Sequence, residues 1–310
     1  MDFDTSPVLL HVGLHKCAST WLQKNMFDNP DIGLVSPWGR MASVAVTEFA
    51  TVDPLAFDAV QTRVRLLAAA DPVDIGDRMA VLSHEALSSR PHHGRYYAPH
   101  VAERLKATFG NARVLMIFRE QKSLIKSLYG EFLRNGGRLT LREFIGTGTE
   151  PPGFAANCAL SFFEFDRLLE MYTAYFGQDR VLVLPLEMLS RDPDGFVERI
   201  CGFVDRPAVR LPTGERVNTA WGAVTYDLLR HSNSVIRGDA LKPRTGPVFL
   251  VRRRALDLVD RMIPAAAQRR VSRRQDAMIV DRVGARYRNS NLRLAERIGL
   301  DLGALGYDCA

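Results

Sequence analysis

A lysine and two hydroxyl side chains follow the first apolar run of the sequence within a few positions. Residues 7–12 are typical of a buried strand, and a helical pattern begins at about Ser19. Lys16, Ser19 and Thr20 therefore lie in a strand-to-helix turn, where backbone N–H groups and the helix dipole favour an anion. Gly13 lets the chain turn tightly after the strand. The segment predicts an anion-binding loop; the alternative is an ordinary turn with an exposed lysine.

A second group of anion-binding side chains follows a later apolar run. Residues 113–118 predict a strand, Arg119 stands directly after it, and residues 121–134 show a helical pattern. Ser127 lies about two turns into that helix, so it and Arg119 reach one phosphate only if the strand end and the helix face converge. Taken alone, Arg119 has a second interpretation, which is an ion pair with Glu120 or a helix carboxylate.

The elements that must position these side chains alternate along the chain. Apolar, β-branched runs are followed by helical patterns, which predicts an α/β fold with a mostly parallel central sheet flanked by helices. Ligands of such sheets bind beyond the carboxyl ends of the strands. The predicted strands are residues 7–12, 79–82, 113–118 and 180–184. The predicted helices are residues 19–27, 121–134, 157–176 and 193–204, with a helical pattern from Trp221 onward that is interrupted by a basic loop at 238–247.

The first anion-binding loop resembles the 5′-phosphosulfate loop of the sulfotransferases that use 3′-phosphoadenosine 5′-phosphosulfate (PAPS). That loop is commonly KxGTT followed by an aromatic residue and a helix, and the string from His11 to Gln23 is similar to bacterial members with HxGxxKTGTTxLQ. Cys17 and Ala18 replace the common Thr and Gly. The resemblance implies a donor-binding loop made of His15, Lys16, Cys17, Ala18, Ser19, Thr20 and Trp21.

The second group resembles the 3′-phosphate site of the same family, an Arg that closes a strand and a Ser eight residues later. By that resemblance Arg119 and Ser127 bind the 3′-phosphate, which distinguishes PAPS from ATP. The resemblance spans most of the chain. It implies a P-loop-NTPase-like sulfotransferase fold in a single domain over residues 1–310, with a helical, basic portion at about 220–310. It further implies PAPS as donor, adenosine 3′,5′-bisphosphate (PAP) as product, and no metal.

Sulfuryl transfer needs a group that stabilises the bridging oxygen and a base that deprotonates the acceptor. Lys16 is expected to stabilise that oxygen. Some members of the family use a Glu shortly after the first helix, but residues 31–40 contain none. Others use a His just past the strand that precedes the Arg119 strand, and His84 and Glu85 stand at that place. His84 is the expected base, and Glu85 orients it or acts itself; for each, the alternative is a cap of the next element.

Composition and charge limit the ligands, partners and location that can be expected for this chain. The net charge of +6 suits an anionic ligand, and the basic residues crowd between 237 and 297, where most are expected on solvated helix faces. Aromatic residues are not interleaved with them, so nucleic acid is not an expected partner. The chain has neither the pattern of a signal peptide nor a run long enough to span a membrane, which predicts a cytoplasmic protein. The four cysteines are widely spaced and are expected to be free thiols, and His11 is expected to be a core histidine.

Two other functions compete with sulfuryl transfer. A P-loop nucleotide kinase or NTPase would need Mg²⁺ and a carboxylate at a strand end, yet no apolar run ends in Asp, and Gly13 with Lys16 does not make GxxxxGK[ST]. A non-catalytic protein would bind anionic glycans or lipid head groups through the C-terminal arginines. The sequence leaves the acceptor open among polysaccharide, glycolipid and small molecule, and leaves the oligomeric state open.

Overall fold

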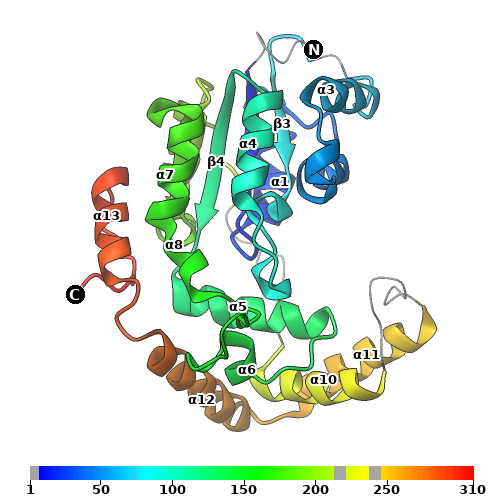
Figure 1. Cartoon of the computed structure of the whole chain (residues 1–310), viewed down its shortest axis with the longest axis vertical. Coiled ribbons are helices and arrows are strands. Elements are labelled where there is room, and N and C mark those ends of the chain that lie inside the picture. The colour runs from blue at the N-terminus through cyan, green and yellow to red at the C-terminus, as the bar shows by residue number, and fades with distance from the viewer. Residues whose placement is uncertain (1–6, 74, 213–220, 237–245) are drawn as a thin grey trace.

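A five-stranded, all-parallel sheet forms the centre of the fold (Figure 1). The computed structural model describes residues 7–73, 75–212, 221–236 and 246–310. The strand order is β2-β3-β1-β4-β5, and every pairing is parallel. The strands are β1 (Val8–His11), β2 (Leu34–Val35), β3 (Met79–Ser83), β4 (Ala112–Phe118) and β5 (Val181–Pro185). The predicted α/β fold with a parallel sheet is therefore confirmed.

The order of the strands creates a crevice at the carboxyl edge of the sheet. β1 lies in the middle, with β2 and β3 on one side and β4 and β5 on the other. The chain thus leaves β1 toward one side and leaves β4 toward the other, which opens a ligand site between their carboxyl ends. All four residues of β1 are buried, because helices cover both faces of the sheet.

Helices from the first two thirds of the chain surround the sheet; α4 and α7 can be followed beside β4 in Figure 1, whereas α5 and α6 lie beyond the carboxyl end of β4. They are α1 (Ser19–Asn25), α2 (Ser43–Ala45), α3 (Ala59–Ala68), α4 (Ala98–Thr108), α5 (Gln121–Arg134), α6 (Leu141–Ile145), α7 (Phe165–Phe176), α8 (Leu186–Arg191) and α9 (Pro193–Phe203). The predicted bounds of α5 are confirmed. The Asp192 side chain caps α9 by accepting a hydrogen bond from the Gly195 N–H at 3.0 Å.

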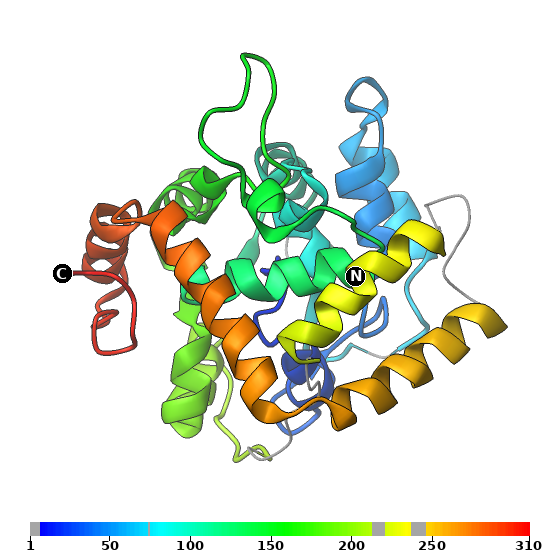
Figure 2. The ribbon, with the colours of Figure 1, turned by 90° about the horizontal axis from the view of Figure 1, so that it is seen from below.

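Most of the C-terminal helices lie beyond the carboxyl edge of the sheet, and the last one returns to its side (Figure 1). They are α10 (Ala223–Val235), α11 (Pro247–Met262), α12 (Ala265–Val283) and α13 (Arg288–Ile298). α12 packs on α5 and α10, and α13 returns to pack on α7 (Figures 1 and 2). The helical pattern predicted after Trp221 is confirmed for the described residues. Most of the basic loop predicted at 238–247 lies outside them.

Two local predictions were wrong. Residues 157–176 are not one helix, since a 3₁₀ turn (Leu160–Phe163) precedes α7. Phe163 and Phe165 are both buried, and a continuous α-helix would turn them about 200° apart, so a break between them lets both reach the core. The two-residue strand β2 was missed, because so short an element shows no periodicity.

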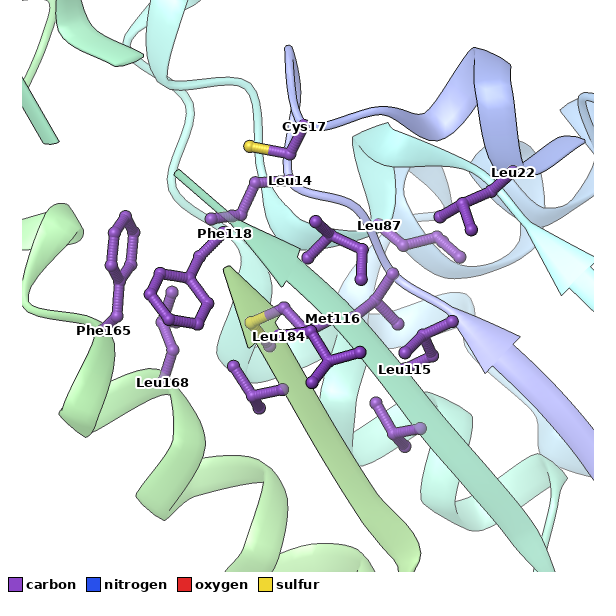
Figure 3. Close-up of a cluster of buried hydrophobic side chains, with 14 of the residues drawn as sticks. Leu14, Cys17, Leu22, Leu87, Leu115, Met116, Phe118, Phe165, Leu168 and Leu184 are labelled. Atoms are coloured by element: carbon purple, nitrogen blue, oxygen red, sulfur yellow. The ribbon is translucent and has the colours of Figure 1, made fainter. Parts of the chain in front are cut away.

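The core continues from the sheet into the anion-binding loop (Figure 3). Leu14 and Cys17 lie in one apolar cluster with Leu115 and Phe118 of β4. Cys17 is fully buried, and burial raises the pKa of its thiol far above the usual range. Cys17 therefore anchors the loop in the core. It and the other three cysteines are free thiols, as predicted.

His11 is a core histidine, as predicted. Its ring is fully buried, and Nδ1 shares a hydrogen bond with Ser83 Oγ at 2.8 Å. Ser83 Oγ also accepts a hydrogen bond from Gln23 Nε2 at 3.0 Å. Burial, and then the nearby His84, lower the pKa of His11 from 6.5 to about 3. His11 is therefore neutral in the folded protein at any pH well above 3.

We predict that replacement of His11 flattens the loss of stability in acid. Between pH 6.5 and 3 the unfolded chain binds a proton at His11 that the folded chain does not, so stability falls as the pH falls. One such group contributes a slope of about 1.4 kcal/mol per pH unit. Urea unfolding at several pH values should show a smaller slope between pH 6 and 4.5 for His11→Asn than for the unsubstituted protein. Equal slopes would contradict the assignment.

Candidate active site

One large cavity lies at the carboxyl edge of the sheet, between the sheet and the C-terminal helices. Its volume is about 1570 Å³. The walls come from segments that follow β1, β3, β4 and β5, and from α10 and α12. All of the predicted donor-binding residues contribute to the lining, namely His15, Lys16, Cys17, Ala18, Ser19, Thr20, Trp21, Arg119 and Ser127.

The loop after β1 holds an unusual backbone conformation. Lys16 and Ala18 have φ values of 63° and 59°, in the left-handed region that favours glycine. Ala18 stands where the KxGTT pattern has Gly. This chain therefore adopts a backbone conformation that suits glycine, although the residue is alanine. Ala18, the residue at the N-cap of α1, has no side-chain oxygen that could cap the first turn. The hydroxyl of Ser19 is buried and has no hydrogen-bond partner among the described residues, which leaves a donor for a ligand at this loop.

Glycine at position 13 allows the loop to pass close to the segment after β3. Its φ is 103°, and a Cβ there would lie 2.9 Å from the carbonyl oxygen of Glu85. The close approach brings Glu85 beside the loop, and Glu85 lines the cavity. No hydrogen bond to the Glu85 carboxylate is found within the described ranges of the chain.

His84, in contrast, is absent from the cavity wall. It is 7 % exposed, and its Nδ1 accepts a hydrogen bond from the Ala86 N–H at 3.0 Å, which caps a 3₁₀ turn. Burial lowers the pKa of His84, while the charge of Glu85 acts to raise it. The geometry does not fit the expectation that His84 is the base, because its Nδ1 lone pair is used in the cap. Of the two neighbours, Glu85 is the one that reaches the cavity.

Arg119 and Ser127 converge on the same cavity from β4 and α5, as their spacing required. Arg119 Nε donates to Ser123 Oγ at 3.0 Å. The alternative pairing with Glu120 is not observed, because the Glu120 carboxylate caps α5 by accepting from the N–H groups of Lys122 and Ser123. In the part of the chain that the structure describes, Arg119 forms no ion pair. Its guanidinium is available to an anion.

One cavity residue that the sequence analysis missed is Glu131. Its Oε2 lies 3.1 Å from Lys16 Nζ, and both side chains are about 30 % exposed. Burial acts to raise the pKa of Glu131, but the charge and hydrogen bond of Lys16, together with His92 and Arg134, outweigh it and the pKa is lowered. The signal was present, since Glu131 stands four residues after Ser127 and therefore one turn along the same helix face.

His15 and Trp21 line the two flanks of the loop. The rings of His15 and His92 meet edge to face at 4.7 Å, and burial followed by the influence of His92 holds the pKa of His15 well below its usual range. His15 is therefore neutral at pH 7. Trp21 packs against Phe196 and donates from Nε1 to the carbonyl of Pro212 at 3.4 Å. Its indole forms an apolar wall of the cavity.

The far wall of the cavity comes from the C-terminal helices. Trp221 and Tyr226 lie there, and the guanidinium of Arg134 stacks on both rings at 5.2 and 5.7 Å. Gln268 and Ser272 of α12 continue this wall. The described residues contain no cluster of three or more His, Cys, Asp or Glu side chains that could hold a metal ion. Among the same residues, no helix is long and apolar enough to span a membrane.

Comparison with known proteins supports the fold. No protein-family model matches the chain, and no curated protein matches it. The structure of a sulfotransferase from Alicyclobacillus acidocaldarius is similar over 97 % of this chain and 99 % of that one, with 16 % identity and a TM-score of 0.57. This chain shares the fold of that protein along its whole length.

Two sulfotransferase domains are more distant. The domain from the curacin biosynthetic pathway aligns over 66 % of this chain and 75 % of its own, with 16 % identity and a TM-score of 0.37. The domain from the Synechococcus PCC 7002 olefin synthase aligns over 77 % of this chain and 91 % of its own, with 14 % identity and a TM-score of 0.39.

We predict that Ala18→Gly stabilises the protein. The left-handed conformation costs an alanine about 1 kcal/mol, which glycine avoids, although glycine loses part of the gain through its freer unfolded chain. Urea unfolding should give a free energy of unfolding higher by about 0.5 kcal/mol. Ala277→Gly, in the exposed middle of α12, is the matched control and should lower it by about 1 kcal/mol. A loss of stability in both variants would refute the strain at Ala18.

Proposed function

We propose that this chain transfers a sulfuryl group from PAPS to a hydroxyl or amine of an acceptor. The observation that carries the proposal is the convergence of two separate anion sites on one cavity. The Lys16 loop follows β1, Arg119 and Ser127 follow β4, and all of them line the cavity wall. PAPS carries its negative charge at two ends, and two separated sites match that pattern. The fold shared with a sulfotransferase supports the same function.

The 5′-phosphosulfate is assigned to the loop after β1. Lys16 supplies a charge there, and Ser19 Oγ and the backbone N–H groups that begin α1 supply donors. Trp21 provides an apolar face beside the loop for the adenine ring. Lys16 pairs with Glu131. A partly exposed pair of this kind is weak, so a doubly charged phosphosulfate can replace Glu131 as the partner of Lys16.

The 3′-phosphate is assigned to Arg119 and Ser127. The guanidinium already donates to Ser123 Oγ, which holds it against α5 and leaves its other N–H groups for the phosphate. A guanidinium and hydroxyl pair is a strong donor set for phosphate oxygens. ATP and GTP lack a phosphate at this place, so this site is the one that selects PAPS.

The reaction is an in-line displacement at sulfur. The acceptor oxygen or nitrogen forms a bond to sulfur while the bond from sulfur to the 5′-phosphate oxygen breaks, and PAP leaves with that oxygen. Lys16 stabilises the charge that grows on the bridging oxygen. We assign the acceptor proton to the Glu85 carboxylate, because Glu85 lines the cavity beside the loop and has no hydrogen-bond partner among the described residues.

The acceptor is assigned to the end of the cavity between α5 and the C-terminal helices. A cavity of about 1570 Å³ exceeds the usual size of a single small-molecule site, which leaves room for an acceptor beside the donor. Trp221, Tyr226 and Gln268 form its wall there. Such a wall suits a carbohydrate, lipid-linked or small-molecule acceptor. Incubation with labelled PAPS and a panel of polysaccharides, glycolipids and small alcohols, in the presence of EDTA, tests transfer directly.

Nucleotide-dependent phosphoryl transfer is the second candidate, favoured by the position of Glu85 after β3, next to β1. A carboxylate there is also suited to Mg²⁺ in a kinase or NTPase. Calorimetric titrations in EDTA separate the two functions. PAP should bind without Mg²⁺, whereas a kinase would require Mg²⁺ and prefer ATP.

We predict that Arg119→Ala weakens PAP binding selectively. The variant loses the charge-assisted bonds to the 3′-phosphate, so its Kd for PAP should rise by about tenfold to a hundredfold. Its Kd for AMP, which has no 3′-phosphate, should change little. Arg180→Ala, at an exposed arginine outside the cavity, should bind both ligands normally. An equal loss for PAP and AMP would contradict the assignment of the 3′-phosphate.

We further predict that Lys16 and Glu85 are needed for transfer. Lys16→Ala should reduce the transfer of label from PAPS by about a hundredfold or more, with an unchanged circular dichroism spectrum. Glu85→Gln should reduce transfer by about a hundredfold or more while PAP binds as before. Glu131→Gln is the matched carboxylate control and should retain transfer. Full activity in Glu85→Gln together with a large loss in Glu131→Gln would move the role of base to Glu131.

A further inference from the structure

The outer face of α11 carries an exposed apolar stripe. Val248, Val251, Ala255, Leu258 and Met262 are spaced by three, four, three and four residues, so they lie along one side of the helix. The four larger side chains are 59, 65, 61 and 81 % exposed, and Ala255 is also exposed. α11 lies at the periphery of the molecule in Figure 2. The described part of the chain leaves this stripe uncovered.

The acidic residues of the same helix face inward and are already bound. Asp257 accepts a hydrogen bond from Trp221 Nε1 at 2.7 Å. Asp260 accepts from the Gly222 N–H at 2.8 Å and from Thr225 Oγ1 at 2.6 Å. These bonds attach α11 to α10 and to the wall of the cavity, since Trp221 and Gly222 line it. The outer face is left with apolar and basic residues.

The basic residues border the stripe. Arg254 and Arg261 are exposed, and neither of them forms an ion pair within the described ranges. Arg254 and Arg261 are each one residue before a member of the stripe and seven residues apart, so they form a row directly along its edge. The next helix, α12, carries three further exposed arginines outside the cavity, at 270, 273 and 274.

We propose that α11 docks on the surface of an anionic lipid bilayer. The stripe would enter the boundary between head groups and acyl chains, and the arginines beside it would bind acidic head groups. We define this lipid-facing surface as the apolar stripe together with Arg254 and Arg261. α11 is about 24 Å long and carries several arginines, so it lies on the bilayer and does not cross it.

The charges argue against a second copy of the chain as the occupant of this surface. When two helices pair along a stripe with this spacing, the residues that flank the stripe face one another. Depending on the relative direction of the two helices, Arg254 and Arg261 of one copy would then face the same arginines of the other copy, or the opposite, uncharged edge of its stripe. Like charges at these positions disfavour pairing, whereas acidic lipids neutralise them.

Flotation of the full-length chain with lipid vesicles tests this proposal. The chain should bind phosphatidylcholine vesicles that contain phosphatidylglycerol and should not bind pure phosphatidylcholine vesicles. Replacement of the stripe in Val251→Glu with Leu258→Glu should lower the partition coefficient by about tenfold or more. Replacement of the arginine row, in the double variant Arg254→Ser with Arg261→Ser, should lower the partition coefficient by about tenfold or more. Added salt should also lower it.

The matched control is a second exposed apolar row, on α3. Val60→Glu with Val64→Glu makes the same chemical change at residues 67 and 55 % exposed, and it should leave vesicle binding unchanged. Circular dichroism and PAP binding report on the fold and the cavity of each variant. Equal binding to both kinds of vesicle, or equal loss in the α3 control, would overturn the proposal.

Two further measurements separate the lipid surface from other occupants. Sedimentation analysis without vesicles should show no change of oligomeric state in the stripe variant, and a dimer that dissociates there would assign the stripe to a second copy instead. Inorganic phosphate at millimolar concentration should leave vesicle binding of the unsubstituted chain largely intact. If inorganic phosphate abolished vesicle binding while the stripe variant still bound vesicles, the arginines would be assigned to a free anion. Failure of any of these tests leaves the assignment of PAPS to the cavity unaffected, because PAP binding is measured separately.

Discussion

The backbone pairing of β1 with β4 is the interaction on which the candidate site depends. The ladder does not stop at the end of β1, because the Leu14 N–H donates to the carbonyl of Ile117 at 2.9 Å and the Ile117 N–H donates to the carbonyl of Gly13 at 2.9 Å. Lys16 stands two residues after Leu14, and Arg119 stands two residues after Ile117. The same pair of hydrogen bonds therefore sets the position of both cations. A shift of this register would separate them.

The charges of the cavity are largely balanced by the protein itself. Lys16 pairs with Glu131, Lys126 with Asp276 at 2.6 Å, and Lys122 with Asp308 at 3.7 Å. These side chains are 20 to 52 % exposed, so each pair contributes little stability and is open to exchange with an anionic ligand. Arg119 differs, because its guanidinium is held by a hydroxyl and not by a carboxylate. The cavity thus contains lysines that are paired with carboxylates and an arginine, Arg119, that is held by a hydroxyl.

The sequence predicted the parts of the site that depend on local order and missed those that depend on packing. The strand ends, α5 and the loop after β1 follow from apolar runs and from spacing along the chain, and Arg119 with Ser127 needed only the geometry of one strand and one helix. The wall formed by Trp221 and Gln268 was not predicted, because it requires α10 and α12 to fold back over α5. Glu131 depends on both local order and packing. Its position on the helix was predictable, but its partner Lys16 is 115 residues away.

His84 and Glu85 are neighbours in the sequence, but the fold gives their side chains different places. After β3 the chain enters a 3₁₀ turn, whose first N–H groups need acceptors. The side chain that precedes the turn is the one able to supply an acceptor, so His84 turns back to the Ala86 N–H and is buried. Glu85, the next residue, lines the cavity, and Gly13 lets the loop approach its backbone closely. The need to cap one short turn thus explains why His84 is absent from the cavity wall that Glu85 lines.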